Sequence, residues 1–560
     1  MNYPSRNDDS LLHPTWNQSL PQLAADLTTR QNLNGIVNSR EHKESENKIT
    51  SKQVPVVFKE HEPSQELFPA VAEVASPGEP PRSPPGHEDT SWSPSASRYS
   101  GRIFGVFTKF TKFIGPGFLI AVAYIDPGNY ATDVSAGAET KFALLFIVLM
   151  SNLFAIFLQS LTIKLGTVTG LNLAENCKAH LPKWLTIILY ILAESAIIAT
   201  DIAEVVGSAI ALNLLLRIPL VAGCAITLVD VLVILIFYRP DGSMVAVRAF
   251  EWFVMAIVLG VVVCFCIELS LIRNSSVGEV FRGYLPSAAV IQSNGLYLSC
   301  GILGATVMPH SIFLGSGVVQ SRLRHFDIQE GHLSTTVTSG GDGDEKYRPS
   351  VAAIRHCLQH SIVELALTLF TFALFVNSSI LIVAGSSLFG NVEAAEADLF
   401  GIHKLLSDTI APAAGTTFAL ALLLSGISAG IVCTMAGQMV SEGMLNWRVA
   451  PWLRRLLTRS ISIIPSIIIA AAVGKAGLNA TLAATQVVLS AILPFVTAPL
   501  IYFTSLDRYM TVTTRVPPGD DVEGVEMGNH WAVTVVGFLI WMVIAIMNVA
   551  LLVLVGLGKM

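Results

Sequence analysis

Charged residues are scarce in this chain of 560 residues: Asp, Glu, Lys and Arg make up 14% of it, and hydrophobic residues make up 52%. The mean hydropathy is +0.58. Soluble domains carry about 25% charged residues, so this composition excludes an ordinary soluble protein. The scarcity is greatest after residue 100, because the first 100 residues hold 22 of the 76 charged residues. The sequence therefore predicts a polar tail joined to a membrane-embedded body.

Several other signatures are absent. The net charge of −6 and the lack of a long basic run exclude a nucleic-acid binder. No G-x-x-x-x-G-K-[ST] string, the phosphate-binding P-loop, is present, so we do not expect this chain to hydrolyse ATP. The seven cysteines form no C-x-x-C pair, and we expect each to be a small buried hydrophobic residue. Residues 1–10 are polar with no apolar run behind them, so the first hydrophobic helix is expected to act as the targeting signal.

Residues 1–100 are rich in Ser, Pro, Asn, Gln and Glu, and three Ser-Pro pairs occur between residues 76 and 94. Such a composition cannot bury enough apolar surface to offset the loss of chain entropy on folding. We therefore predict a disordered cytosolic tail at 1–100 and a membrane-embedded helical domain at 101–560. The tail is open to two interpretations: a phosphorylated segment that binds regulatory proteins, or a solvated extension without a regulatory role.

Apolar stretches close to or above the roughly 20 residues that cross a bilayer recur from residue 113 onward. Eleven helices are predicted, near 113–137, 143–163, 185–213, 218–238, 250–272, 297–319, 361–386, 413–438, 460–475, 480–504 and 531–556.

The distribution of Lys and Arg predicts the orientation of these helices, because such residues accumulate on the cytoplasmic side. If the tail is cytosolic, nineteen Lys and Arg after residue 100 fall in internal segments and seven in external ones. This bias favours a cytosolic N-terminus and an extracytosolic C-terminus. The glycosylation sequons at Asn274 and Asn479 then fall in predicted external loops.

Two of the predicted helices are interrupted. In the first, Asp126 precedes Pro127 and Gly128 where an apolar helix should continue, and in the sixth, Pro309 is followed by His310. Proline removes a backbone donor, and an intramembrane carboxylate is costly unless it is used. Corresponding breaks in helices 1 and 6 are typical of transporters built from two inverted repeats, with the binding site between the breaks. The alternative is a simple kink whose Asp finds a buried partner.

The residues at the two breaks predict a cation site. Asp126 offers a carboxylate, Asn129 an amide oxygen, and the unwound segments offer carbonyl oxygens such as those of Ala123 and Ala305. These oxygens suit any divalent cation, whereas the thioether of Met308 favours transition metals such as Mn²⁺ or Fe²⁺ over Mg²⁺ or Ca²⁺. The alternative for Met308 is ordinary packing.

A second group of acids lies on the predicted third helix, where Glu194, Asp201 and Glu204 fall within about 80° of one another. Stacked acids without Lys or Arg on their helix indicate a proton relay. His310 is a further candidate for proton movement. The alternatives are acids that serve helix packing, especially at Glu194, and a histidine that only caps the broken helix.

The motifs Asp126-Pro127-Gly128-Asn129 and Met308-Pro309-His310 resemble those of the Nramp family of proton-coupled divalent metal transporters, in particular its fungal manganese-transporting members. The resemblance covers about residues 100–560. It implies an all-α polytopic membrane protein of the LeuT type, with a 5+5 inverted repeat, an eleventh helix, and broken helices 1 and 6.

The resemblance also implies roles for particular residues. It implies that Asp126, Asn129, Met308 and the carbonyl of Ala305 or Ala123 bind the metal, and that Gln486 approaches the ion in some states. It further implies that Asp126, Asp201, Glu204, His310 and Arg459 take part in proton movement. Ser311 departs from the family's most widespread pattern, in which Asn follows Met-Pro-His, but serine keeps a hydrogen-bonding group at this position.

We therefore expect a proton-coupled symporter for Mn²⁺, and also for Fe²⁺, and not an enzyme; it needs no cofactor. We expect it in the plasma membrane or in an endomembrane such as that of a vacuole or vesicle. Two alternatives stay open: a metal-sensing receptor with a transporter fold, and a sodium-coupled amino-acid carrier of the same fold.

Overall fold

The computed structural model describes residues 115–237, 244–272, 275–332, 347–390, 399–445, 451–472, 474–513 and 524–557. The predicted tail at 1–100 lies outside the described residues, and so does the sequon residue Asn274.

Helices make up most of the described chain. Their bounds are α2 Pro116–Val122, α3 Pro127–Thr140, α4 Leu145–Thr169, α5 Leu173–His180, α6 Lys183–Leu216, α7 Leu220–Phe237, α8 Met244–Leu271, α9 Val277–Gly283, α10 Ser293–Thr306, α11 Pro309–Val318, α12 Gln320–Gln329, α13 Val351–Thr368, α14 Leu374–Ser387, α16 Leu399–Thr409, α17 Pro412–Leu445, α18 Pro451–Ala472, α19 Gly474–Ser505, α20 Asp507–Met510 and α21 Trp531–Gly556. A 3₁₀ turn, η1, covers Ala288–Ile291, and a π-helical segment, η3 (Leu369–Ala373), joins α13 to α14.

Eight helical segments within the described residues are long and apolar enough to cross a membrane. In a bilayer each backbone polar group must be satisfied within the segment, which is why apolar runs of this length form helices. The other three predicted spans coincide with the pair α2 and α3, with α7 and with α18. The prediction of a helical multi-pass membrane protein is thus confirmed, whereas the count of eleven spans and the 5+5 repeat stay predictions.

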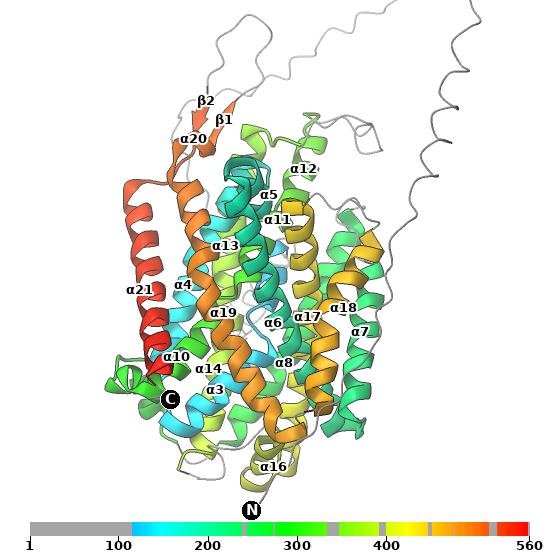
Figure 1. Cartoon of the computed structure of the whole chain (residues 1–560), viewed down its shortest axis with the longest axis vertical. Coiled ribbons are helices and arrows are strands. Elements are labelled where there is room, and N and C mark those ends of the chain that lie inside the picture. The colour runs from blue at the N-terminus through cyan, green and yellow to red at the C-terminus, as the bar shows by residue number, and fades with distance from the viewer. Residues whose placement is uncertain are drawn as a thin grey trace, which may run out of the picture. The chain divides into compact units, whose positions relative to one another are not determined.

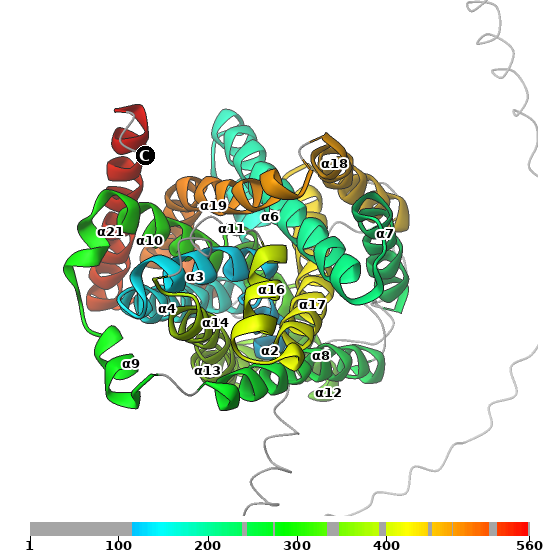
Figure 2. The ribbon, with the colours of Figure 1, turned by 90° about the horizontal axis from the view of Figure 1, so that it is seen from below.

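The two interrupted helices lie inside the bundle. Figures 1 and 2 show α3 beside α4 and α14, and α10 and α11 beside α19, with α7 and α18 together at one edge and α21 at the opposite edge. In agreement, α3 packs mainly against α14 and α10, and α11 packs against α4 and α17. The segments where the two helices break are therefore enclosed by other helices.

One element was not predicted from the sequence. Strands β1 (Thr511–Thr513) and β2 (Gly524–Glu526) pair antiparallel after α20, with Val512 opposite Val525. They lie at the same end of the bundle as α5 and α12, whereas α16 and the C-terminus lie at the other end (Figure 1).

Two expectations about single residues were wrong. Five of the seven cysteines are buried as expected, but Cys357 is half-buried and Cys266 is exposed, because it lies on an outward face of α8. The sequon residue Asn479 lies within helix α19 and not in a loop.

Candidate metal site

The first break follows from the local sequence. Helix α2 ends in tight i to i+3 turns, in which the amides of Ala123, Tyr124 and Ile125 each donate over 3.1 Å to the carbonyl three residues earlier. Helix α3 restarts with Pro127 in its first turn, where the missing N–H is not needed. Asp126 caps it, and its carboxylate accepts from the amides of Gly128 at 3.0 Å and Asn129 at 3.1 Å.

The second break has the same form. Helix α10 ends at Thr306, and Val307 and Met308 leave the helical conformation before Pro309 starts α11. The carbonyl of Met308 accepts from the hydroxyl of Ser311 at 2.8 Å. Met308 is fully buried. Each break thus brings the negative C-terminal end of one half-helix near the positive N-terminal end of the next.

Asn129 connects the two breaks. Its side-chain Nδ2 donates to Asp126 Oδ1 at 2.6 Å, to the carbonyl of Tyr124 at 3.1 Å and to the carbonyl of Ala305 at 3.3 Å. Asp126 and Asn129 are both fully buried, and Oδ1 of Asn129 has no hydrogen-bond partner among the described residues. A carboxylate, two main-chain carbonyls and an amide therefore converge on one point between α3 and α10. Ala123, the other carbonyl named from the sequence, belongs to the C-cap residue of α2.

Gln486 on α19 lies beside this point. A Cβ atom on Gly128 would lie 2.1 Å from Nε2 of Gln486 and 2.8 Å from Oδ2 of Asp126, so both side chains pack closely against this glycine. The carbonyl of Gln486 likewise packs against Gly304, whose added Cβ would lie 2.2 Å from it. Gln486 is fully buried, and its Oε1 has no hydrogen-bond partner within the described part of the chain. Helix α19 thus brings a further amide oxygen to the broken helices.

Three polar side chains next to the breaks, which were not predicted as a group, form a triangle of hydrogen bonds. The hydroxyls of Tyr124 and Ser311 lie 3.1 Å apart, and Nε2 of Gln159 donates to both over 2.9 Å. This triangle ties α4 to both broken helices. It also gives Ser311, the residue that departs from the family pattern, a direct contact with the first break.

Two further residues, which were not predicted from the sequence, hydrogen-bond to the main-chain carbonyls of the unwound segment at the first break. Nδ2 of Asn377 on α14 donates to the carbonyl of Tyr124 at 3.2 Å, and the hydroxyl of Ser425 on α17 donates to the carbonyl of Ile125 at 2.8 Å. Both residues are polar positions within long apolar helices, which is the one signal that the sequence offers for them.

The candidate proton residues gather on α6. The carboxylates of Asp201 and Glu204 and the thiol of Cys433 on α17 lie within 4.8 Å of one another, and all three residues are buried. Helix α6 approaches the first break closely, since a Cβ on Gly207 would lie 2.3 Å from Pro127.

The remaining candidates differ in their position. Nδ1 of His310 lies 3.3 Å from the hydroxyl of Thr200, the residue before Asp201, so His310 links α11 to the same helix. Glu194 is half-buried, in the first half of α6. Arg459 lies in α18, but its side chain is outside the described part of the structure.

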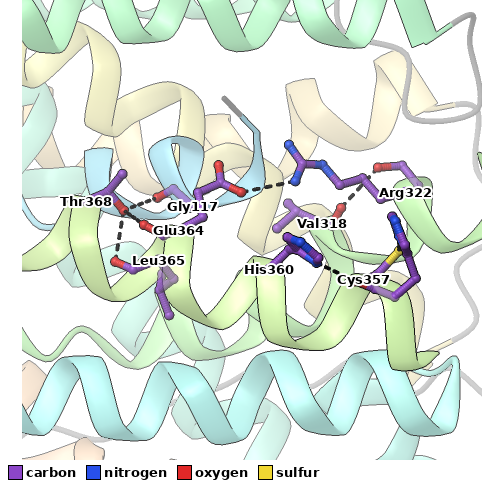
Figure 3. Close-up of polar contacts among 10 residues, drawn as sticks. Gly117, Val318, Arg322, Cys357, His360, Glu364, Leu365 and Thr368 are labelled. Carbon is purple, nitrogen blue, oxygen red and sulfur yellow. Dashed lines mark hydrogen bonds and ion pairs between the residues drawn. The ribbon is translucent and has the colours of Figure 1, made fainter. Parts of the chain in front are cut away.

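An ion pair holds the start of α2. Nη1 of Arg322 on α12 lies 3.0 Å from Oε2 of Glu364 on α13, whose side chain is 8% exposed (Figure 3). The guanidinium lies directly over Gly115, and the hydroxyl of Thr368 donates to the carbonyl of Gly117 at 3.2 Å. The half-helix α2 is therefore fixed at one end by this pair and at the other by the carbonyl contacts at the break.

The chain is similar to known proteins over most of its length. The family model "Natural resistance-associated macrophage protein-like", Nramp, matches residues 117–554. The chain is 49% identical over 501 residues to manganese transporter SMF1 of Saccharomyces cerevisiae. The aligned region covers 81% of this chain and 87% of that protein. It is 52% identical over 454 residues to manganese transporter pdt1 of Schizosaccharomyces pombe, covering 80% of this chain and 86% of the relative.

Iron transporter SMF3 of Saccharomyces cerevisiae is 52% identical over 409 residues, covering 73% of this chain and 84% of that protein. Among solved structures, a manganese transporter of Eremococcus coleocola matches with a TM-score of 0.65 and 32% identity, covering 79% of this chain and 86% of the other. The family match spans nearly the whole described bundle, including both broken helices, and the chain therefore belongs to the Nramp family.

Proposed function

We propose that the chain transports divalent transition metal ions, Mn²⁺ and also Fe²⁺, across a membrane toward the cytosol, together with protons. The names of its relatives, which include manganese and iron transporters, support this assignment. The transported ion is the substrate, and no bound cofactor takes part. The N-terminus is cytosolic and the C-terminus extracytosolic, as the distribution of Lys and Arg favours.

The observation that carries the proposal is the convergence of oxygens on Nδ2 of Asn129. This amide donates to three oxygens, those of Asp126, Tyr124 and Ala305, which lie around one point. A divalent cation at that point would be held by the same oxygens. If the amide of Asn129 turns by 180°, Oδ1 replaces Nδ2 and becomes a further ligand. Oxygen ligands around a buried carboxylate suit a partly dehydrated divalent ion.

The choice among divalent ions depends on Met308. This residue stands at the second break, three positions after Ala305, and is fully buried. A thioether contributes little to binding of Ca²⁺ or Mg²⁺ but binds softer transition ions. Met308 therefore favours Mn²⁺ and Fe²⁺, and the amide oxygen of Gln486 completes the site in a state where α19 moves closer.

Protons take a separate route along α6. Helix α6 packs against the first break at Pro127, and Asp201 and Glu204 lie together with Cys433 at the α6–α17 contact. Binding of a cation to Asp126 changes the electrostatic potential at the carboxyl of Glu204. Metal binding and proton transfer are therefore coupled electrostatically. His310 and Arg459 complete the proposed route.

Uptake into proteoliposomes tests the proposal. The full chain is reconstituted, and Mn²⁺ entry and lumenal acidification are followed with external pH set below internal pH. We expect Mn²⁺ entry with accompanying acidification, independent of Na⁺. Saturable Mn²⁺ binding without flux would instead indicate a metal-sensing receptor, and Na⁺-dependent amino-acid uptake would indicate a carrier of the same fold.

A further inference from the structure

A histidine pair lies at the start of α13, outside the proposed transport site. The segment reads His356-Cys357-Leu358-Gln359-His360, and both histidines are exposed. The residues of the transport proposal do not include them. They lie on α13 before Glu364, and His356 contacts Phe326 of α12; Figure 3 shows His360 on this helix.

The spacing places both imidazoles on one face of the helix. Their ring centroids are 5.4 Å apart, with an angle of 31° between the ring planes. Residues at i and i+4 are neighbours on a helix surface, and two histidines at this spacing are a common zinc-binding arrangement. The two rings are therefore already close enough to share one ion with little change in the backbone.

Contacts around the rings restrict their orientation. Nδ1 of His360 donates to the carbonyl of His356 over 2.7 Å, which places the lone pair of the neutral ring on Nε2. Histidines that bind metals commonly donate their other ring N–H to a backbone carbonyl in this way. The ring of His356 stacks on Phe326 of α12, with centroids 4.8 Å apart. Both side chains are thus held before any ion binds.

The pair is accessible to ions from solution. The continuous helical segment Val351–Ser387 has 37 residues, or about 55 Å at 1.5 Å per residue. The hydrocarbon core of a bilayer is about 30 Å thick, so the first turns of α13 extend beyond it. His356 and His360 lie in these turns, and solvent can reach them.

We propose that His356 and His360 form a second metal site, which binds late transition ions such as Zn²⁺ and Co²⁺. Imidazole nitrogens bind these ions more strongly than Mn²⁺, and they bind Ca²⁺ poorly. Sγ of Cys357 lies 4.0 Å from Nδ1 of His356, so a soft donor adjoins the pair. The second site shares no residue with the transport site. Under the orientation proposed above, it lies on the cytosolic side of the membrane.

Calorimetric titration of Zn²⁺ into the purified full chain tests this site. The chain carries Asp126→Ala, so the transport site is weakened and a failure here does not bear on transport. We expect about one Zn²⁺ per chain, with Mn²⁺ unable to compete at equal concentration. His356→Gln and His360→Gln, singly and together, should weaken Zn²⁺ binding at least about tenfold.

His325→Gln on the neighbouring helix α12 serves as the matched control, because it removes a histidine that has no partner at i+4. It should leave Zn²⁺ affinity unchanged. Gel filtration checks that each variant stays monodisperse. Zn²⁺ binding of equal strength in the His356/His360 double variant, or no Zn²⁺ binding by the Asp126→Ala chain, would overturn the proposal.

Discussion

The side-chain amide of Asn129 donates to the main-chain carbonyl of Ala305 over 3.3 Å, although the two residues are 176 positions apart and belong to different broken helices. The same amide also contacts Asp126. One buried side chain therefore holds the two breaks in register. The proposed binding of a cation between the breaks depends on this contact.

Asn129→Ala should impair Mn²⁺ uptake strongly while the protein still folds. The variant loses both the link between the breaks and the proposed amide ligand, and a hydrogen bond to a charged group contributes about 1.5–3 kcal/mol, equivalent to about tenfold or more in affinity. Kinetics of Mn²⁺ uptake, with the KM compared to that of the unmodified chain, provide the measurement.

Ser135→Ala is the matched control for this variant. Ser135 lies on the same helix, and its hydroxyl donates to the carbonyl of Ala131 within α3. Its removal should leave the KM for Mn²⁺ unchanged. An Asn129→Ala chain with normal KM would show that the amide is not a ligand.

Met308→Ala should keep part of the Mn²⁺ flux but admit Ca²⁺. The oxygens at the breaks suit either ion, so discrimination depends on the thioether. Ca²⁺ uptake is compared in vesicles that contain the variant or Met547→Ala, a methionine change on α21 away from the breaks. Ca²⁺ exclusion that persists in the Met308→Ala vesicles would contradict the proposed role of the sulfur.

Gly304→Ala should destabilise the protein and reduce uptake. The new Cβ would lie 2.2 Å from the main-chain carbonyl of Gln486, and a backbone atom cannot move aside as a flexible side chain can. Overpacking of this kind costs about 1–3 kcal/mol. Thermal unfolding of the detergent-purified chain measures the loss. Gly278→Ala on α9 is the control, because an added Cβ there meets nothing within 4 Å, and this variant should keep the Tm of the unmodified chain. Equal Tm values for the two variants would contradict the close packing of α10 on α19.

The ion pair between Arg322 and Glu364 is expected to show strong coupling. Removal of Arg322 leaves a carboxylate buried without its cation, and breaking such a pair costs about 3–5 kcal/mol. The double variant Arg322→Ala/Glu364→Ala should therefore be more stable than Arg322→Ala alone. Thermal unfolding of the single and double variants forms a double-mutant cycle, and strictly additive effects would exclude coupling between the two residues.

Much of the fold could be predicted from the sequence, because long apolar runs allow only helices in a bilayer. The breaks could also be located, since Pro127 and Pro309 interrupt otherwise apolar segments. The strands β1 and β2 could not, because three residues each are too few to show an alternating pattern. Their pairing depends on the chain returning after α20.

The contacts around the breaks were harder to predict than the breaks. Gln159, Asn377 and Ser425 are polar residues within long apolar helices, and many such residues satisfy only their own helix. Ser428, for example, donates to the carbonyl of Leu424 on its own helix. Only helix packing decides which polar side chain meets an unwound carbonyl, and a linear sequence does not contain that information.

Mn²⁺ uptake into proteoliposomes as a function of external pH, with Asp126→Ala as the comparison, tests the central claim most directly. With internal pH fixed at 7.5, the unmodified chain should take up Mn²⁺ faster as external pH falls from 7.5 to 5.5, and the lumen should acidify with the metal. The Asp126→Ala chain should show neither flux. Mn²⁺ uptake that is independent of external pH, or that persists in the Asp126→Ala chain, would contradict proton-coupled transport through the broken helices.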